Sequence, residues 1–177
     1  HAFDPTLLPA PRPTLNSGSS KTILSSKANI SGNFQANGHG IPSQKNWSIR
    51  GRALVTDVPI TYLGYVNRDT GVIEEPGHPL DGTPIKDTIL IYPKGSGSTV
   101  APFVLMGLIY TGRGPMGIIN SDVCPLTLPA ASLLGTPYAH SFDADPIMNI
   151  NSGDLVQMQL SDRKTTIKVI SRNGEER

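Results

Sequence analysis

Apolar residues recur in short runs from Trp47 onward, and these runs predict a series of strands and short helices. The run Thr88–Pro93 (TILIYP) is continuously apolar and closed by proline, which is typical of a strand buried on both faces. Gly117–Asn120 predicts a second buried strand. Residues 48–55 and 137–142 predict further strands. Residues 100–110 and 125–134 predict helices that end near glycines.

The C-terminal part has the clearest alternation. Val156, Met158 and Leu160 are separated by glutamines, and Ile167 and Val169 flank a lysine. The polar residues 161–164 between the two segments predict an antiparallel hairpin with one wet face. Together the pattern predicts an α/β fold, in which a mixed sheet carries helices on one side and hairpins at its ends.

Residues 1–47 lack this order. Ser, Asn, Gly and Pro dominate the stretch, and no helical or strand period is visible in it. We therefore expect a linker or loosely docked extension over 1–47, a domain over 48–172 and a short tail over 173–177. His39, between two glycines, is interpreted as an exposed loop histidine, with a ligand as the less favoured alternative.

The charge and the cysteine content of the chain limit the kinds of partner and metal site that it can have. Only 16% of residues are charged, and 15 Lys+Arg against 14 Asp+Glu give a net charge of +1. This balance gives no reason to expect a nucleic acid or a membrane as partner, and no apolar stretch approaches the ~20 residues that span a bilayer. A single cysteine, Cys124, excludes an intrachain disulfide framework and a self-contained iron–sulfur or zinc site. We expect a soluble, cytoplasmic protein.

One segment has the composition of a site. Lys94–Thr99 (KGSGST) joins the buried strand to the predicted helix 100–110, and Ser98 or Thr99 is expected at the N-cap. Free amides at the helix start favour an anion or an oxygen that becomes anionic. Three interpretations stay open from composition: Ser98 caps the helix, the loop holds a phosphate, or Ser98 is reactive. The Walker pattern is missing.

A resemblance favours the third interpretation. Over about two-thirds of the chain, from Gly51 to Val169, the sequence resembles the small subunit or small domain of the aconitase X family. The similar pieces are Gly51–Val55, Pro59–Gly64, Thr70–Ile73, Gly77–Gly82, Pro93–Val100, Ile118–Asn120 and Ser152–Asp154. The resemblance implies a swivelling β/β/α domain, and it places Ser98 on the serine that takes the substrate proton in this superfamily.

The same resemblance implies the remaining parts of a dehydratase. A large aconitase X subunit or domain would be the partner and would carry an iron–sulfur cluster or other metal centre as Lewis acid, with no cofactor bound by this chain. Gly95, Gly97 and Thr99 of the loop are expected to bind the substrate. So is Asn120, because ligands bind at the carboxyl ends of such strands.

The substrate is expected to be a small hydroxy acid. Val100 stands where citrate-type aconitases carry a carboxylate-binding arginine, which implies a different acid. The long leading segment favours cis-3-hydroxy-L-proline over phosphomevalonate, the other known substrate of the family. The alternative from another class is a non-catalytic module that binds an anion or a partner.

Other polar residues are weaker candidates. His78, in a Gly-His-Pro motif, is expected to shape a turn rather than to carry protons. Glu74 and Glu75 are adjacent and would face opposite ways on a strand. Asp143 and Asp145 share a face but lack further oxygen donors for a cation, and Cys124 is expected to be a small buried hydrophobe.

Overall fold

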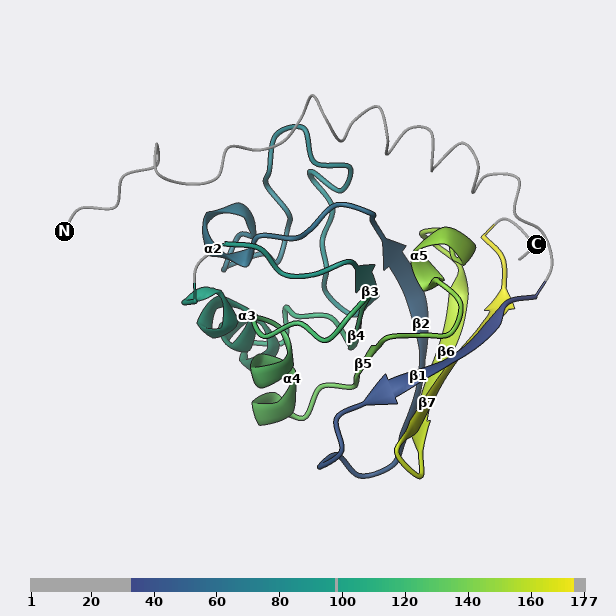
Figure 1. Ribbon diagram of the computed structural model, residues 1–177. Helices are drawn as coiled ribbons and strands as arrows, with labels where there is room; N and C mark the ends of the chain where they lie inside the picture. The colour runs from purple at the N-terminus through teal and green to yellow at the C-terminus, as the bar shows by residue number, and fades with distance from the viewer. Residues whose placement is uncertain (1–32, 98, 174–177) are drawn as a thin grey trace.

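A computed structural model of the chain describes residues 33–97 and 99–173 (Figure 1). Its strands and helices follow the predicted order closely after residue 47. In chain order the elements are β1 (Gln35–Gly40), β2 (Trp47–Val55), α2 (Tyr62–Tyr65), β3 (Ile89–Tyr92), α3 (Ala101–Tyr110), β4 (Gly117–Asn120), α4 (Leu128–Leu134), β5 (Tyr138–His140), α5 (Pro146–Asn149), β6 (Leu155–Ser161) and β7 (Lys164–Ser171).

The strands form a closed barrel in the order β1-β5-β4-β3-β2-β6-β7. The neighbours β2, β3, β4 and β5 run parallel, whereas β1, β6 and β7 pair antiparallel. Helices α2, α3 and α4 lie together on one side, and α5 lies near the other strands (Figure 1). The predicted α/β class with a mixed sheet is confirmed, and so is the C-terminal hairpin, formed by β6 and β7.

The N-terminal end differs from the prediction. Residues 35–40 fall in the stretch expected to be an extension, yet they form β1, which pairs with β5 and β7 and closes the barrel. Gly38 and Gly40 explain why no strand pattern is visible. A Cβ on Gly38 would lie 2.8 Å from the His140 carbonyl oxygen, and one on Gly40 would lie 2.8 Å from Thr165 Oγ1. Close approach of the backbone, rather than side-chain packing, therefore determines these residues.

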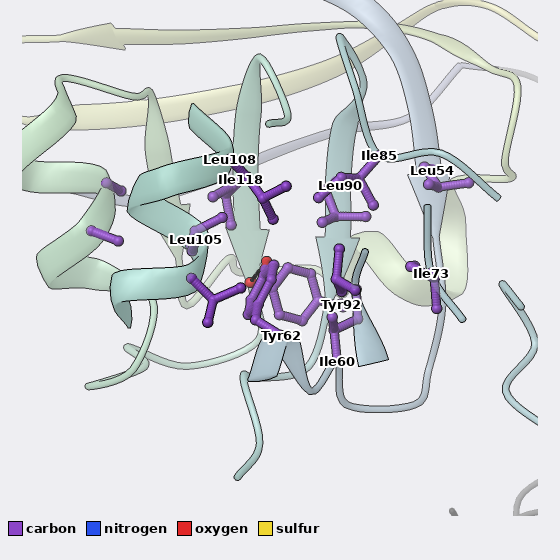
Figure 2. Packing of buried hydrophobic residues seen from close by; sticks show 14 of the residues in the cluster. Leu54, Ile60, Tyr62, Ile73, Ile85, Leu90, Tyr92, Leu105, Leu108 and Ile118 are labelled. Carbon is purple, nitrogen blue, oxygen red and sulfur yellow. Dashed lines mark hydrogen bonds between the residues drawn. The ribbon is translucent and has the colours of Figure 1, made fainter. Parts of the chain in front are cut away.

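Strand β3 separates two apolar layers. Ile89 and Ile91 face the barrel interior, whereas Leu90 and Tyr92 face the helices. On the helix side they pack with Leu105 and Leu108 of α3 (Figure 2). The prediction of a strand buried on both faces is confirmed. Such two-sided burial fixes where β3 ends, and so where the following loop begins.

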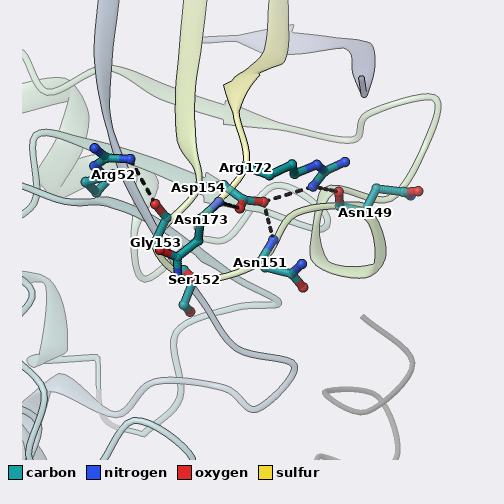
Figure 3. Close-up of polar contacts among 8 residues, drawn as sticks. All are labelled: Arg52, Asn149, Asn151, Ser152, Gly153, Asp154, Arg172 and Asn173. Carbon is teal, nitrogen blue, oxygen red and sulfur yellow. Dashed lines mark hydrogen bonds and ion pairs between the residues drawn. The ribbon is translucent and has the colours of Figure 1, made fainter. Parts of the chain in front are cut away.

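A buried ion pair joins the start of β6 to the end of the chain (Figure 3). Asp154 Oδ2 lies 2.9 Å from Arg172 Nη1, and both side chains are largely buried. The same carboxylate accepts the backbone amides of Asn151 and Asn173, each at 2.8 Å. Arg172 also donates to the Asn149 carbonyl oxygen at 2.9 Å. Asp154 belongs to the Ser152–Asp154 piece of the resemblance, and its contacts give that piece a structural role.

Candidate functional site

The Gly-Ser loop follows β3 at the carboxyl edge of the parallel strands, as predicted. Ser98 itself lies outside the described residues. Its neighbours Gly97 and Thr99 are both exposed, and Gly97 has a φ of +102°, in the region that favours glycine. The described part of the loop thus brings the residues on either side of Ser98 to the surface.

The first half of the loop is tied down on both sides. Toward the preceding loop, the Ser96 amide donates to the Ile60 carbonyl oxygen at 2.9 Å, and the Ile60 amide donates to the Lys94 carbonyl oxygen at 3.2 Å. Toward the loop after β4, the Gly95 amide donates to Cys124 Sγ at 3.3 Å. Gly95 is buried, and its amide is occupied by the contact with Cys124, so Gly95 positions the loop. Binding of the substrate by Gly95 stays a prediction.

The space around Gly95 explains the residue type. A Cβ there would lie 3.3 Å from both Leu126 Cβ and Thr127 Oγ1. Cys124, predicted to be a small buried hydrophobe, is buried as expected, and its sulfur in addition holds the loop.

Helix α3 starts later than predicted. Its N-cap is Val100, which makes no side-chain cap hydrogen bond, and the first helical residue is Ala101, followed by a proline in the first turn. The expectation that Ser98 or Thr99 is the N-cap is therefore wrong, because both residues precede Val100. The proline explains the shift, because it favours the first turn of a helix. The observed N-cap is thus Val100, and both a phosphate-binding role of the loop and a reactive Ser98 stay predictions.

A buried polar network supports the loop from below. The hydroxyls of Tyr62 and Tyr92 share a hydrogen bond (Figure 2). The Tyr92 hydroxyl also lies 3.2 Å from Thr127 Oγ1. The Tyr138 hydroxyl donates to Asn120 Oδ1 at 2.8 Å and accepts the Cys124 amide at 3.1 Å. Burial raises the pKa of Tyr92 to about 12 and also raises those of Tyr62 and Tyr138. The phenols therefore stay neutral and serve as hydrogen-bonding groups.

Asn120 belongs to this network. It is 1% exposed, and its Nδ2 donates to the Tyr92 carbonyl oxygen at 3.1 Å. Both ends of its amide are thus engaged within the chain. The structure brings Asn120 to the same sheet edge as the Gly-Ser loop, as predicted, but beneath the surface, and its binding of substrate stays a prediction.

His78 shapes a turn, as predicted. Its Nδ1 accepts the Leu80 amide at 3.0 Å, and its Nε2 lies 3.2 Å from the Pro59 carbonyl oxygen. Burial lowers the pKa of His78, which favours the neutral ring that this pair of contacts requires. Because Ile60 is bonded to the Gly-Ser loop, the turn supports that loop indirectly.

The two aspartates considered for a cation have local roles. Asp143 Oδ1 accepts the Asn37 amide at 2.9 Å and so fastens β1. Asp145 caps α5 by accepting the Ile147 amide at 2.9 Å. Within residues 33–97 and 99–173, no three His, Cys, Asp or Glu side chains gather as a metal site.

An apolar surface on α3 was not predicted from the sequence. Phe103 is 68% exposed and Tyr110 is 83% exposed, and Val100 at the helix start is also exposed. A groove of about 320 Å³ lies beside Val100 and Phe103; its lining residues are Arg68, Val100, Phe103, Val104, Gly107, Leu108 and Thr111. We call this surface the α3 face. Its residues read as core in the sequence, since nearly every residue of α3 is apolar.

No helix among the described residues has the length and apolar character that crossing a bilayer demands.

Comparisons with known proteins add to this geometry. A family model for the aconitase X swivel domain matches residues 42–169. The phosphomevalonate dehydratase small subunit of Methanocella arvoryzae is 38% identical over 106 residues, which cover 60% of this chain and 80% of that protein. The protein of the same name from Methanosarcina acetivorans is 34% identical over 112 residues, 63% of this chain and 78% of that protein.

Solved structures agree in fold. The crystal structure of Thermococcus kodakaraensis aconitase X in its holo-form has a TM-score of 0.67 and 23% identity, and the match covers 76% of this chain and 98% of that chain. The solution NMR structure of a UPF0107 protein has a TM-score of 0.65 and 25% identity, covering 78% of this chain and all of that one (100%).

Proposed function

Because the chain belongs to the aconitase X swivel domain family, we propose that it is the small component of a dehydratase whose active site is completed by a large subunit. The observation that carries the proposal is the similarity to small subunits named for phosphomevalonate dehydratase, over about four-fifths of their length. The position of the Gly-Ser loop at an exposed strand end supports it.

In this proposal Ser98 is the base. Loss of water from a hydroxy acid breaks a C–H bond and a C–O bond. The electron pair of the C–H bond forms the new C=C bond, and that of the C–O bond leaves with hydroxide, which a Lewis acid on the large subunit would stabilise. Ser98 accepts the proton, and the amides at the start of α3 stabilise its alkoxide. The inward anchoring of Gly95 and Ser96 keeps the loop in place as the proton moves.

The metal centre of such an enzyme would lie on the large subunit. The described residues offer no ligand set for it, and Cys124 is buried against the Gly95 amide. An iron–sulfur cluster does not fit this chain, because such clusters are held by several thiolates and the chain has one cysteine.

The names of the relatives favour phosphomevalonate as the substrate, instead of the cis-3-hydroxy-L-proline that the long leading segment favours.

A purified complex with the large subunit from the same organism should release water from phosphomevalonate, whereas the chain alone should neither turn over substrate nor hold iron. Both substrates should be assayed with both preparations. Turnover by the isolated chain, or none by a verified complex with either substrate, would favour the non-catalytic module instead.

The α3 face is the surface that we assign to the large subunit. It is continuous with the Gly-Ser loop, since Val100 follows Thr99 directly and Phe103 lies in the first turn of α3. A base at this edge must meet a substrate held by the large subunit, so the surface beside it must come close to that subunit. Exposed aromatic residues beside an apolar groove are typical of interface centres.

Phe103→Glu should weaken assembly by at least about 10-fold, because it places a charge in an apolar contact. Titration calorimetry of the two subunits measures this. Met148→Glu is the matched control, since Met148 is an exposed apolar residue on α5. Equal affinities for the Phe103 variant and the unchanged chain would place the interface elsewhere.

A further inference from the structure

Two histidines from distant parts of the chain face each other across neighbouring strands. His39 of β1 and His140 of β5 are register partners, and their ring centroids lie 5.8 Å apart with the planes tilted by 30°. Partners in register point to the same side of a sheet. His140 is also the register partner of Asn120, so the pair lies at the carboxyl edge of the parallel strands, two strands away from β3.

The His140 ring is held in one orientation. Its Nδ1 lies 2.8 Å from Ser141 Oγ. Ser141 has a φ of +54°, rare for a residue with a side chain, and its amide is fixed by the Ser121 carbonyl oxygen at 2.9 Å. When Nδ1 donates to Ser141, Nε2 carries a free lone pair. A hydrogen bond that orients the other nitrogen is the usual support of a metal-binding histidine.

The charges around the pair are mixed. Burial and the neighbouring His39 lower the pKa of His140, while Asp122 opposes that shift. Lys164 of β7 is the register partner of His39, and with Asp143 it lines a hollow of about 400 Å³ that also includes His39 and Ser141. A metal is the occupant that the geometry favours, because the Ser141 contact at Nδ1 leaves Nε2 of His140 available as a ligand and Asp143 places a carboxylate in the same hollow as His39.

We propose that His39 and His140 form a two-imidazole site for a divalent transition metal such as Cu²⁺, Ni²⁺ or Zn²⁺. A metal–nitrogen bond of about 2.0 Å puts each ring centroid roughly 3.2 Å from the ion, so two ligating rings have centroids up to about 6.4 Å apart. The observed 5.8 Å falls below this limit. The separation of the rings is therefore compatible with one ion bound between them.

Among the described residues no third His, Cys, Asp or Glu joins the pair, so the proposed site takes its remaining ligands from water. The site is independent of the dehydratase proposal. It also gives a function to the Gly38-His39-Gly40 motif, in which Gly38 lets β1 approach the His140 carbonyl oxygen of β5 and Gly40 lets it approach Thr165 of β7.

Isothermal titration of the full chain with CuCl₂, NiCl₂ and ZnCl₂ tests the site. We expect one saturable site with copper bound most tightly. Affinity should fall at least about 10-fold in either His39→Gln or His140→Gln and by less in Ser141→Ala, which removes only the orienting contact. Binding should also weaken as the pH is lowered, because a protonated imidazole cannot ligate a metal.

Two further substitutions make the test specific. All titrations are made in a His1→Ala background, so that His1 contributes no competing site, and His78→Asn, which removes a buried histidine outside the pair, should keep the affinity of that background. Circular dichroism should show that the His39 and His140 variants are folded. The proposal is overturned by absence of saturable binding, by unchanged affinity in both glutamine variants, or by phosphate rather than metal shifting the NMR signals of the two rings.

Discussion

Replacing Ser98 by alanine is expected to lower turnover of the assembled dehydratase by about 10²–10⁴-fold, since this is what a positioned general base contributes. The chain should still fold and bind the large subunit. The N-cap of α3 is Val100, so loss of the Ser98 hydroxyl removes no helix cap. Turnover of the purified complex is the measurement, and thermal melting of the variant chain reports on the fold.

Ser96→Ala is the matched control for this experiment. Ser96 lies in the same loop, and its observed hydrogen bond to Ile60 is made by the backbone amide, which alanine keeps. Its turnover should fall much less than that of the Ser98 variant. If Ser98→Ala retained near-normal turnover, the proton would be taken by another group and this chain would act as a scaffold.

Replacing Asp154 by alanine is expected to destabilise the fold by about 3–5 kcal/mol. Removing Asp154 takes away the carboxylate that faces the buried Arg172 guanidinium, and losing one partner of a buried ion pair is strongly destabilising. The change also leaves the Asn151 and Asn173 amides without their acceptor (Figure 3). Urea unfolding gives the free energy, and the melting temperature should fall by roughly 10–15 °C.

Two control variants distinguish the loss of any carboxylate from the loss of the buried Asp154–Arg172 pair. Asp81→Asn, an exposed aspartate, should change stability by less than about 0.5 kcal/mol. The double variant Asp154→Ala/Arg172→Met should be less destabilised than the sum of its single changes, because no buried charge is left alone. Additive effects would mean that the pair is not coupled.

Much of the fold could be predicted because its strands carry side-chain patterns. The apolar run at Ile89–Tyr92 and the alternation around Met158 reflect burial on two faces and on one face, and both strands are present as expected. Strand β1 could not be predicted in this way. Its contribution is backbone pairing between residues with small or polar side chains, and that leaves no hydrophobic period.

The site shows the same division. The loop and its place at a strand end follow from glycines next to an apolar run, so the sequence could indicate them. The hydrogen bonds of Asn120 with Tyr138 and of the Gly95 amide with Cys124 could not be predicted, because their partners come from later segments of the chain. The exposure of Phe103 could not be predicted either, because nearly all residues of α3 are apolar and the sequence does not distinguish its buried face from its exposed face.

Closure of the barrel by β1 has a consequence for folding. The strand pairs Gln35 with Lys168, so its contacts join segments that lie far apart in the sequence. Such pairings raise the contact order and slow folding, because the entropy of closing a long loop is lost before the contacts form. A chain shortened to begin at Trp47 would leave β5 and β7 with free edges that other chains can pair with. Aggregation during refolding should therefore increase sharply when β1 is removed.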